Sequence, residues 1–276
     1  RYWHLSQLFF YLINLNAYFC EIFRKKMANS KRKPVTKARK KTSLGAKLRS
    51  FVFKAIKYFL IVSIGSVVVF KFVPIPFTWT MLDQKMTSIG NGEDSEINYS
   101  WRSYSEISKE MPLAVVAAED QLFPDHFGFD FNSMQNAFKN NLKGKKVRGA
   151  STISQQTAKN VFLWQGRSYV RKVLEVYFTF LIEVVWGKER ILEVYINVAE
   201  MGKNTFGAEA ASQKYFGKSA KDLTRNDAAK LAAILPSPRK WSVTNPGPYV
   251  SRRVPKITRQ MRALGGTAYL KGLRKF

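Results

Sequence analysis

A long apolar run, from Phe51 to Val73, constrains this chain more than any other feature. The run has 23 residues, and a helix of about 20 residues is long enough to cross the hydrocarbon core of a bilayer. Lys57 and Lys71 leave only 13 uncharged residues between them, but lysines near the edge of the core can extend to the head groups. Pro74 and Pro76 then end the helix. We predict one transmembrane helix over 51–73; the alternative is a buried core helix.

The distribution of charge on either side of this run predicts its orientation. The chain has 46 Lys and Arg against 19 Asp and Glu, a net charge of +27. Residues 1–50 hold 13 basic residues and one acidic residue, whereas residues 81–276 hold 30 basic and 18 acidic residues. Because basic segments beside a membrane span stay in the cytoplasm, we expect 1–50 to be a cytoplasmic arm and the bulk of the chain to lie outside. Such a charge also calls for an anionic partner, either nucleic acid, lipid head groups or a phosphorylated substrate.

The first 26 residues differ in composition from the basic arm that follows them. They are aromatic and apolar and begin with Arg1, whereas Met27 opens the basic segment MANSKRKP. We interpret residues 1–26 as a mis-called extension upstream of a start at Met27; the alternative is a second, amphipathic or hairpin membrane element. Since no small-residue cleavage site follows the apolar run, we expect an uncleaved anchor.

Several kinds of site are excluded by composition. Cys20 is the single cysteine, which excludes a disulfide framework and a cysteine-based zinc site. The two histidines, His4 and His126, lie far apart in the sequence and form no metal-binding cluster. The nearest approach to a Gly-rich phosphate loop is GNG at 90–92, which acidic residues follow. Metal-centred chemistry and nucleotide cofactors bound by Gly-rich loops are therefore not expected.

The part of the chain after the apolar run follows a helical period. Apolar residues recur at three- and four-residue spacings in PLAVVAAEDQLF, SYVRKVLEVYFTFLIEVVWG and KERILEVYINVAEM. Thr224 is a suitable N-cap for a helix that ends before Pro236. The polar segment QKMTSIGNGEDSEINYSWRSY is typical of a linker with a short strand. We predict a mainly α domain without internal repeats.

Two carboxylates stand at the end of one of these helices. Glu119 and Asp120 close the apolar run AVVAAED and face the loop QLFPDHFGFD. A carboxylate among apolar neighbours has a raised pKa, which suits a general acid or base near neutral pH. The alternative is an ordinary acidic pair at a helix end. For His126, in the same loop, we predict a structural hydrogen-bonding role.

The segment VRGASTISQQTAKN, residues 147–160, has the composition of an anion-binding helix start. Small residues and hydroxyls before a helix leave backbone N–H groups free to bind an anion; the alternative is that Ser151 and Thr152 are a plain N-cap. Glu175 follows Arg171 by four residues and Lys172 by three, so all three share one helix face; the alternative there is a surface ion-pair lattice. The basic residues near the segment are Arg148, Lys159, Arg167, Arg171 and Lys172.

Taken together, these segments carry a specific resemblance. The motifs are EDQLFPDHFG (119–128), GASTISQQ (149–156), RKVLE (171–175) and KERILEVYIN (188–197), and a fifth is only partly preserved around Arg253. In this order and spacing the chain resembles the family-51 peptidoglycan glycosyltransferases, and within them the monofunctional, membrane-anchored transglycosylases. In the fourth motif Ile196 stands where Leu is more usual. The resemblance covers about residues 100–260.

The resemblance implies a reaction. Family members polymerise lipid II: the growing glycan on undecaprenyl diphosphate is the donor, and the 4-hydroxyl of a new lipid II is the acceptor. By resemblance, Glu119 is the general base, and Glu175 assists departure of the diphosphate. An α-linked donor that gives a β-1,4 product requires inversion, which agrees with the absence of a Ser/His/Asp or Cys/His nucleophile set.

The resemblance also implies binding residues, without a required cofactor. Contacts to the diphosphate and donor are expected from Lys159, Lys172, Arg148, Arg167, Ser151 and Gln155. Supporting roles are expected for Asp120, His126, Glu193 and Asn197. No protein metal site is expected, although Mg²⁺ or Mn²⁺ can accompany the substrate diphosphate.

The implied organisation is a lysozyme-like α-rich domain with a small second lobe near the membrane. After the transmembrane helix we expect a linker over 74–99, the transglycosylase domain over 100–260 and a basic tail over 261–276. We expect a single-pass protein of the bacterial inner membrane, with its domain on the periplasmic side. Lipid II, the glycan strand and cell-division proteins are the expected partners, and nucleic acid is not. Because no transpeptidase motif set follows, we expect a monofunctional enzyme. The alternatives are a lytic transglycosylase or lysozyme-like hydrolase, and a non-catalytic membrane-anchored scaffold.

Overall fold

The computed structural model describes residues 44–142, 151–166 and 168–273. The predictions for residues 1–43, and for Arg148 and Arg167, therefore lie outside the described residues. The chain divides into two compact units, residues 1–55 and 56–276. The described residues of the first unit, 44–55, belong to the start of helix α2.

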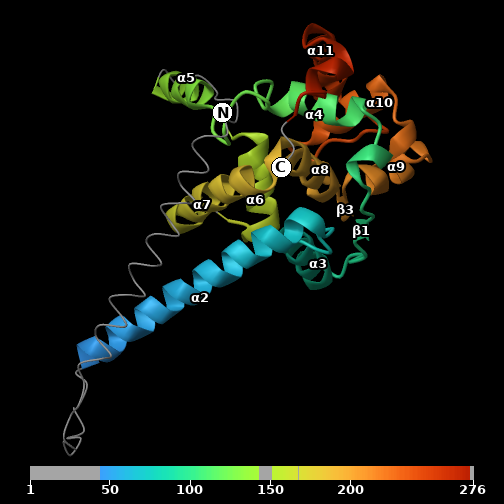
Figure 1. Cartoon of the computed structure of the whole chain (residues 1–276). Helices are drawn as coiled ribbons and strands as arrows, with labels where there is room; N and C mark the ends of the chain where they lie inside the picture. Colours follow the sequence, from blue (N-terminus) through green and yellow to red (C-terminus); the bar gives the residue numbers. More distant parts are fainter. Residues whose placement is uncertain (1–43, 143–150, 167, 274–276) are drawn as a thin grey trace, which may run out of the picture. The chain divides into compact units, whose positions relative to one another are not determined.

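The second unit is built almost entirely of helices (Figure 1), which confirms the predicted mainly α fold. The helices are α2 (Leu44–Phe72), α3 (Trp79–Gly90), α4 (Glu110–Glu119), α5 (Phe131–Leu142), α6 (Ile153–Phe162), α7 (Tyr169–Val185), α8 (Gly187–Val198), α9 (Ala208–Phe216), α10 (Arg225–Ile234) and α11 (Pro248–Ala263). Three short 3₁₀ turns are η1 (Tyr104–Glu106), η2 (Ala220–Asp222) and η3 (Gly266–Leu270). A three-stranded sheet has the order β1 (Asn98–Tyr99), β3 (Thr205–Phe206), β2 (Glu200–Gly202), with β1 parallel and β2 antiparallel to β3.

Helix α4 forms the centre of the core. Every residue from Met111 to Ala117 is buried, so the helix has no polar face, as expected of a helix enclosed on all sides. It packs against α8, α10, α11 and η3 (Figure 1). At α10, Thr224 is the N-cap and accepts a hydrogen bond from the backbone N–H of Asp227, as the sequence predicts.

Helix α2 is the one helix of the described residues that is long and apolar enough to cross a bilayer. It begins at Leu44, seven residues before the predicted start, because 44–50 contains mostly good helix formers. It ends at Phe72, before Pro74, as predicted. Little of its most apolar part is buried, which favours a membrane anchor over the alternative of a core helix.

The end of α2 is held by the side chains of Trp186, between α7 and α8, and of Arg190 on α8. Trp186 donates its indole N–H to the Val67 carbonyl at 2.6 Å. The Arg190 guanidinium donates to the carbonyls of Phe70 at 2.8 Å and Val73 at 2.7 Å. The Phe70 carbonyl belongs to the last turn and the Val73 carbonyl follows it, where a helix leaves its own acceptors unpaired and favours a positive charge. The end of α2 is therefore fixed to the helical domain.

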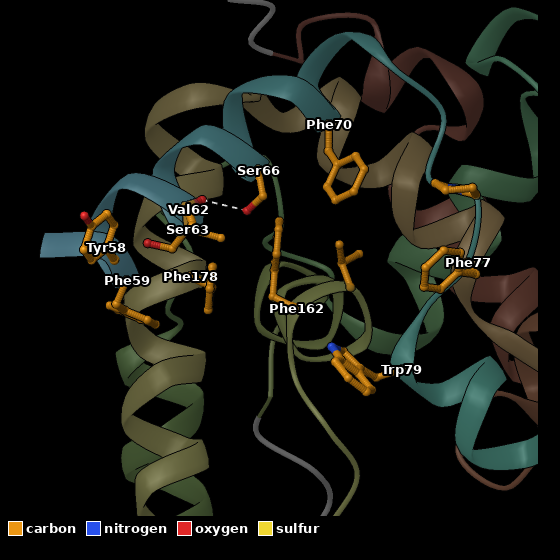
Figure 2. Close-up of a pocket in the computed structure, with 12 residues that line it drawn as sticks. Tyr58, Phe59, Val62, Ser63, Ser66, Phe70, Phe77, Trp79, Phe162 and Phe178 are labelled. Carbon is orange, nitrogen blue, oxygen red and sulfur yellow. Dashed lines mark hydrogen bonds between the residues drawn. The ribbon is translucent and has the colours of Figure 1, made fainter. Parts of the chain in front are cut away.

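An apolar groove of about 600 Å³ lies between this part of α2 and the helices α6 and α7. Figure 2 shows Phe59, Phe162 and Phe178 around it, one ring from each of these three helices. Trp79, at the start of α3, also lines the groove. The groove thus combines walls from the candidate membrane helix and from the folded domain.

Two predicted boundaries are wrong. The segment 74–99, expected to be a linker, contains helix α3, whose N-cap Thr78 accepts from the Met81 N–H. The periodicity of α3 is hidden because three of its buried residues, Thr80, Gln84 and Ser88, are polar. The segment 261–276, expected to be a basic tail, contains the end of α11 and η3, and Leu270 is buried in the core.

Candidate active site

The side chain of Glu119 lies at the C-terminal end of α4 and is half-buried. The side-chain amide of Gln156, on α6, donates to Glu119 Oε2 at 3.0 Å. Arg253, on α11, donates to the carbonyl of the preceding residue, Ala118, at 2.8 Å. Three helices therefore meet at this carboxylate.

Burial raises the pKa of the Glu119 carboxyl, and the neighbouring charge of Asp120 raises it further. The hydrogen bond from Gln156 and the charge of Arg253 lower this pKa, but they offset burial only in part. A carboxylate whose pKa lies above its ordinary value holds a proton more readily, which is what a general base near neutral pH requires.

Asp120 joins the end of α4 to the start of α6. Its carboxylate accepts from the backbone N–H of Ile153, the first residue of α6, at 3.0 Å. It also accepts from His126 Nε2 at 2.9 Å. Both partners hold the side chain of Asp120, and with it the peptide that follows Glu119, in place. The contact of His126 agrees with the hydrogen-bonding role predicted for it.

The start of α6 is a capping box. The Thr152 hydroxyl accepts from the Gln155 N–H at 3.2 Å, and Gln155 Oε1 accepts from the Thr152 N–H at 3.0 Å. Thr152 also donates to the Gly128 carbonyl at 2.6 Å. The side chain of Gln155 is buried, and its Oε1 is bound to the backbone of Thr152; contact with the substrate stays a prediction. Ser151, just before the helix, is exposed.

A cluster of cations surrounds Glu175 on α7. Arg171 Nη1 donates to Glu175 Oε2 at 2.9 Å, and Lys172 Nζ donates to Oε1. Lys159, on α6, is half-buried and faces the same group. Burial lowers the pKa of Lys159, the charge of Glu175 raises it, and the charges of Arg171 and Lys172 lower it further. Three cations around one carboxylate leave an excess of positive charge. We call the group the cation cluster; its members are Lys159, Arg171, Lys172 and Glu175.

Helix α6 connects the cation cluster to the carboxylate at the end of α4. Gln156, which contacts Glu119, and Lys159, which faces Glu175, are three residues apart on α6. Three residues of helix rise about 4.5 Å, so the two side chains leave the helix less than one turn apart. Through Gln156 and Lys159, helix α6 therefore contacts both the Glu119 carboxylate and the cation cluster.

A buried ion pair supports α6 from behind. Glu183 Oε1 accepts from Ser154 at 2.5 Å and from Lys188 Nζ at 2.6 Å, and both charged side chains are 1% exposed. The Lys188 ammonium lies 4.5 Å from the centre of the Phe123 ring. Gly128, at φ 76°, passes so close that a Cβ there would lie 3.1 Å from Glu183 Cγ. One charge pair therefore ties α6, α7, α8 and the loop after α4 together.

Glu193 and Asn197, on α8, contact backbone rather than the site. Glu193 Oε1 accepts from the Tyr104 N–H at 2.9 Å. Asn197 accepts from the Arg102 N–H at 2.9 Å and donates to the Arg102 carbonyl at 2.8 Å. Both side chains brace the segment that leads into α4.

Three residues at the site were not among the predicted site residues. Gln156 and Tyr195 lie inside the second and fourth motifs, and only the spatial contact distinguishes them from their neighbours. Arg253 belongs to the partly preserved fifth motif, where Pro255 breaks the usual pattern; the helix nevertheless continues through the proline and brings Arg253 to Ala118. Within the described residues, no group of three or more His, Cys, Asp or Glu could hold a metal ion.

A half-buried carboxylate with a raised pKa, together with a cluster of cations, can in principle accept a proton and stabilise a departing anion. The sequence matches the model of a family described as "Transglycosylase" over residues 84–262. It is 52% identical to a biosynthetic peptidoglycan transglycosylase of Pseudomonas fluorescens (strain SBW25), over 78% of this chain and 90% of the relative. Proteins of the same name from Chromohalobacter salexigens and Pseudomonas aeruginosa are 52% and 48% identical; each match covers 81% of this chain, and 95% and 97% of the relatives. The chain belongs to the transglycosylase family.

Proposed function

We propose that this protein is a peptidoglycan glycosyltransferase that polymerises lipid II into β-1,4-linked glycan strands and releases undecaprenyl diphosphate. The observation that carries the proposal is the placement of Glu119 and the cation cluster along helix α6. The names of the relatives support a role in cell wall synthesis. The apolar groove beside α2 supports a substrate with a lipid part.

In the proposed reaction, Glu119 takes the proton from the 4-hydroxyl of the acceptor sugar. The acceptor oxygen then forms a bond to C1 of the donor sugar on the face opposite the diphosphate, and the bond from C1 to the diphosphate oxygen breaks. The electron pair of that bond leaves with the diphosphate, whose growing negative charge is stabilised by Lys159 and Lys172. One displacement inverts the anomeric centre, and no covalent intermediate on the protein is needed.

The proposal extends to location and partners. Helix α2 is the anchor, with the basic arm in the cytoplasm and the glycosyltransferase domain on the periplasmic side of the inner membrane. Both substrates are tethered by lipids to that membrane, so an anchored enzyme meets them at its surface. Cell-division proteins are proposed partners. Any Mg²⁺ or Mn²⁺ would arrive with the substrate diphosphate rather than at a protein site.

Purified full-length protein with labelled lipid II tests the proposal. We expect a polymer that a muramidase digests to its repeating units. Shortening of preformed glycan, without polymerisation, would instead establish a lytic enzyme. No conversion of either substrate would identify a non-catalytic scaffold.

The raised pKa of Glu119 predicts the acidic limit of activity. The base works ionised, so the rate falls as the pH drops through the folded-state pKa of Glu119, and this pKa lies above 4.5. The acidic limb of kcat/KM should therefore have its midpoint clearly above the ordinary value for glutamate. A limb at or below that value would contradict the assignment of Glu119 as a buried base.

Replacing Lys172 with alanine should weaken use of the donor. The ammonium lies in the cation cluster and is exposed toward solvent, where it can reach a diphosphate. Loss of one such charge typically costs about tenfold to a hundredfold in rate. The measurement is the initial polymerisation rate against lipid II concentration. Lys221→Ala, an exposed lysine of η2, is the matched control, and equal rates in the two variants would remove Lys172 from the donor site.

A further inference from the structure

Two hydrogen bonds in series connect a buried tyrosine of α8 to the Glu119 carboxylate. The hydroxyl of Tyr195 donates to Gln156 Oε1 at 3.1 Å, and Gln156 Nε2 donates to Glu119 Oε2 at 3.0 Å. Tyr195 is 1% exposed, and its ring is part of the core. The series therefore runs from the interior of the domain to the edge of the candidate active site.

The direction of donation along this series is fixed at the tyrosine. Burial raises the pKa of the Tyr195 phenol well above its ordinary value, and the nearby charges of Glu119 and Asp120 raise it further. The phenol thus keeps its proton, and Gln156 Oε1 is the acceptor that the described residues give to this buried proton. A side-chain amide has one accepting end and one donating end, so an amide that accepts from Tyr195 turns its N–H group toward Glu119, and a turned amide would leave the phenol proton without its acceptor.

We propose that Tyr195 is a positioning residue for the glycosyl transfer, because its hydroxyl fixes the rotation of the Gln156 amide and keeps an N–H donor directed at Glu119. The proposal rests on the proposed role of Glu119 as the general base. It assigns to Tyr195 a function beyond packing, although the side chain itself does not touch Glu119 or a substrate.

The chemical consequence concerns which protonation state of Glu119 the amide stabilises. An N–H group bonds the ionised carboxylate, whereas the carbonyl end of a rotated amide would accept from the protonated acid. In the second arrangement the buried Tyr195 proton would lose its acceptor, Gln156 Oε1, and this loss disfavours the rotated amide. The amide therefore stabilises the ionised carboxylate of Glu119, whereas burial favours its protonated acid.

Other charged groups near Glu119 act independently of this rotation. Asp120 follows it on the chain, where its carboxylate is bound by His126 and by the Ile153 N–H. Arg253 approaches from α11 and lowers the pKa of Glu119. From η3, the Tyr269 hydroxyl donates to the Gln121 carbonyl, and is therefore engaged elsewhere. Within the described residues, Tyr195 therefore acts on Glu119 through the orientation of the Gln156 amide.

The test is Tyr195→Phe in the full-length protein. Once the hydroxyl is lost, the Gln156 amide can rotate and stabilise protonated Glu119. The pKa of Glu119 should then rise by about half a unit to one unit, the equivalent of one net hydrogen bond. The acidic limb of kcat/KM should move up by the same amount, and the plateau at higher pH should stay within about twofold of the original. A uniform fall at every pH, or an unmoved limb, would overturn the proposal.

An NMR titration and the activity of Glu119→Gln together distinguish a failure of the positioning role of Tyr195 from a failure of the role of Glu119. A ¹³C NMR titration of the Glu119 carboxyl, assigned by its loss in Glu119→Gln, reports the same shift without any turnover. If the titration shifts but Glu119→Gln still polymerises lipid II, the assignment of Glu119 as the general base fails while the effect of Tyr195 on this carboxyl stands. If Glu119→Gln is inactive and the titration does not shift, only the positioning role fails.

Two matched variants distinguish the effect of rotating the Gln156 amide from the effect of losing a tyrosine hydroxyl in general. Tyr215→Phe removes a hydroxyl that donates to the Met201 carbonyl at 3.0 Å, away from Glu119, and should leave the acidic limb in place. In a Gln156→Leu background no amide remains to be rotated, so Tyr195→Phe should shift the titration no further. An additional shift of the full size in that background would show that Tyr195 acts on Glu119 by another route.

Discussion

Replacing Glu119 with glutamine is expected to abolish polymerisation of lipid II while the protein stays folded. Glutamine keeps the size of the side chain and can still bond Gln156, but it cannot accept the proton of the acceptor hydroxyl. General base catalysis contributes about 10²- to 10⁴-fold to a rate, so the residual rate should fall at least a hundredfold. The measurement is the initial rate of polymer formation from labelled lipid II at saturating substrate.

Glu110→Gln provides the control, because Glu110 lies at the other end of the same helix. Its carboxylate accepts from Arg225 at 2.8 Å and at 3.0 Å, at the partly exposed start of α4. This variant should retain most of the activity. A Glu119→Gln enzyme with near-original activity and an unchanged melting temperature would show that another group takes the proton.

The largest loss of stability is expected for Lys188→Met. Removing the ammonium leaves the Glu183 carboxylate charged at a position that is 1% exposed, with a hydrogen bond from the Ser154 hydroxyl but without its cation. Breaking a buried ion pair from one side costs about 3–5 kcal/mol. In a domain of this size each kcal/mol lowers the melting temperature by about 2–4 °C, so we expect a fall on the order of 10 °C. Thermal unfolding followed by circular dichroism in detergent measures it.

The exposed pair of Lys203 and Glu93 is the matched comparison for the buried pair. Its side chains are 51% and 42% exposed, and the two charged atoms lie 2.8 Å apart. Solvent screens such a pair, so Lys203→Met should barely move the melting temperature. The double variant Glu183→Leu with Lys188→Met should recover part of the loss, because it removes both buried charges together. Equal effects of the two single Lys→Met changes would refute the importance of the buried pair.

The sequence predicted the helices whose stability comes from one apolar face or from strong end signals. The apolar run identified α2, the buried run from Met111 to Ala117 identified α4, and Thr224 marked the start of α10. Helix α3 was missed because its sequence is largely polar, and its place depends on contacts with α6 that no local pattern records. The η3 turn was missed because a short basic segment carries no sign that Leu270 will be buried.

The candidate site was predictable in its residue types but not in their partners. The motifs predicted Glu119 and Glu175 as catalytic residues, and Lys159 was predicted as a diphosphate contact; in the structure the charges of Lys159 and Glu175 interact. Periodicity alone could not show that Gln155 caps its own helix while Gln156, one residue later, faces the base. Adjacent residues on a helix point about 100° apart, so a single step along α6 separates a structural amide from a functional one.

Helix α8 joins the end of α2 to the residues around Glu119. Arg190 and Tyr195 are five residues apart on α8, a rise of about 7.5 Å along the helix. Arg190 donates to the Phe70 carbonyl in the last turn of α2, and Tyr195 donates to Gln156, which in turn donates to Glu119. A displacement of the end of α2 would therefore reach the Glu119 carboxylate through one helix and two hydrogen bonds.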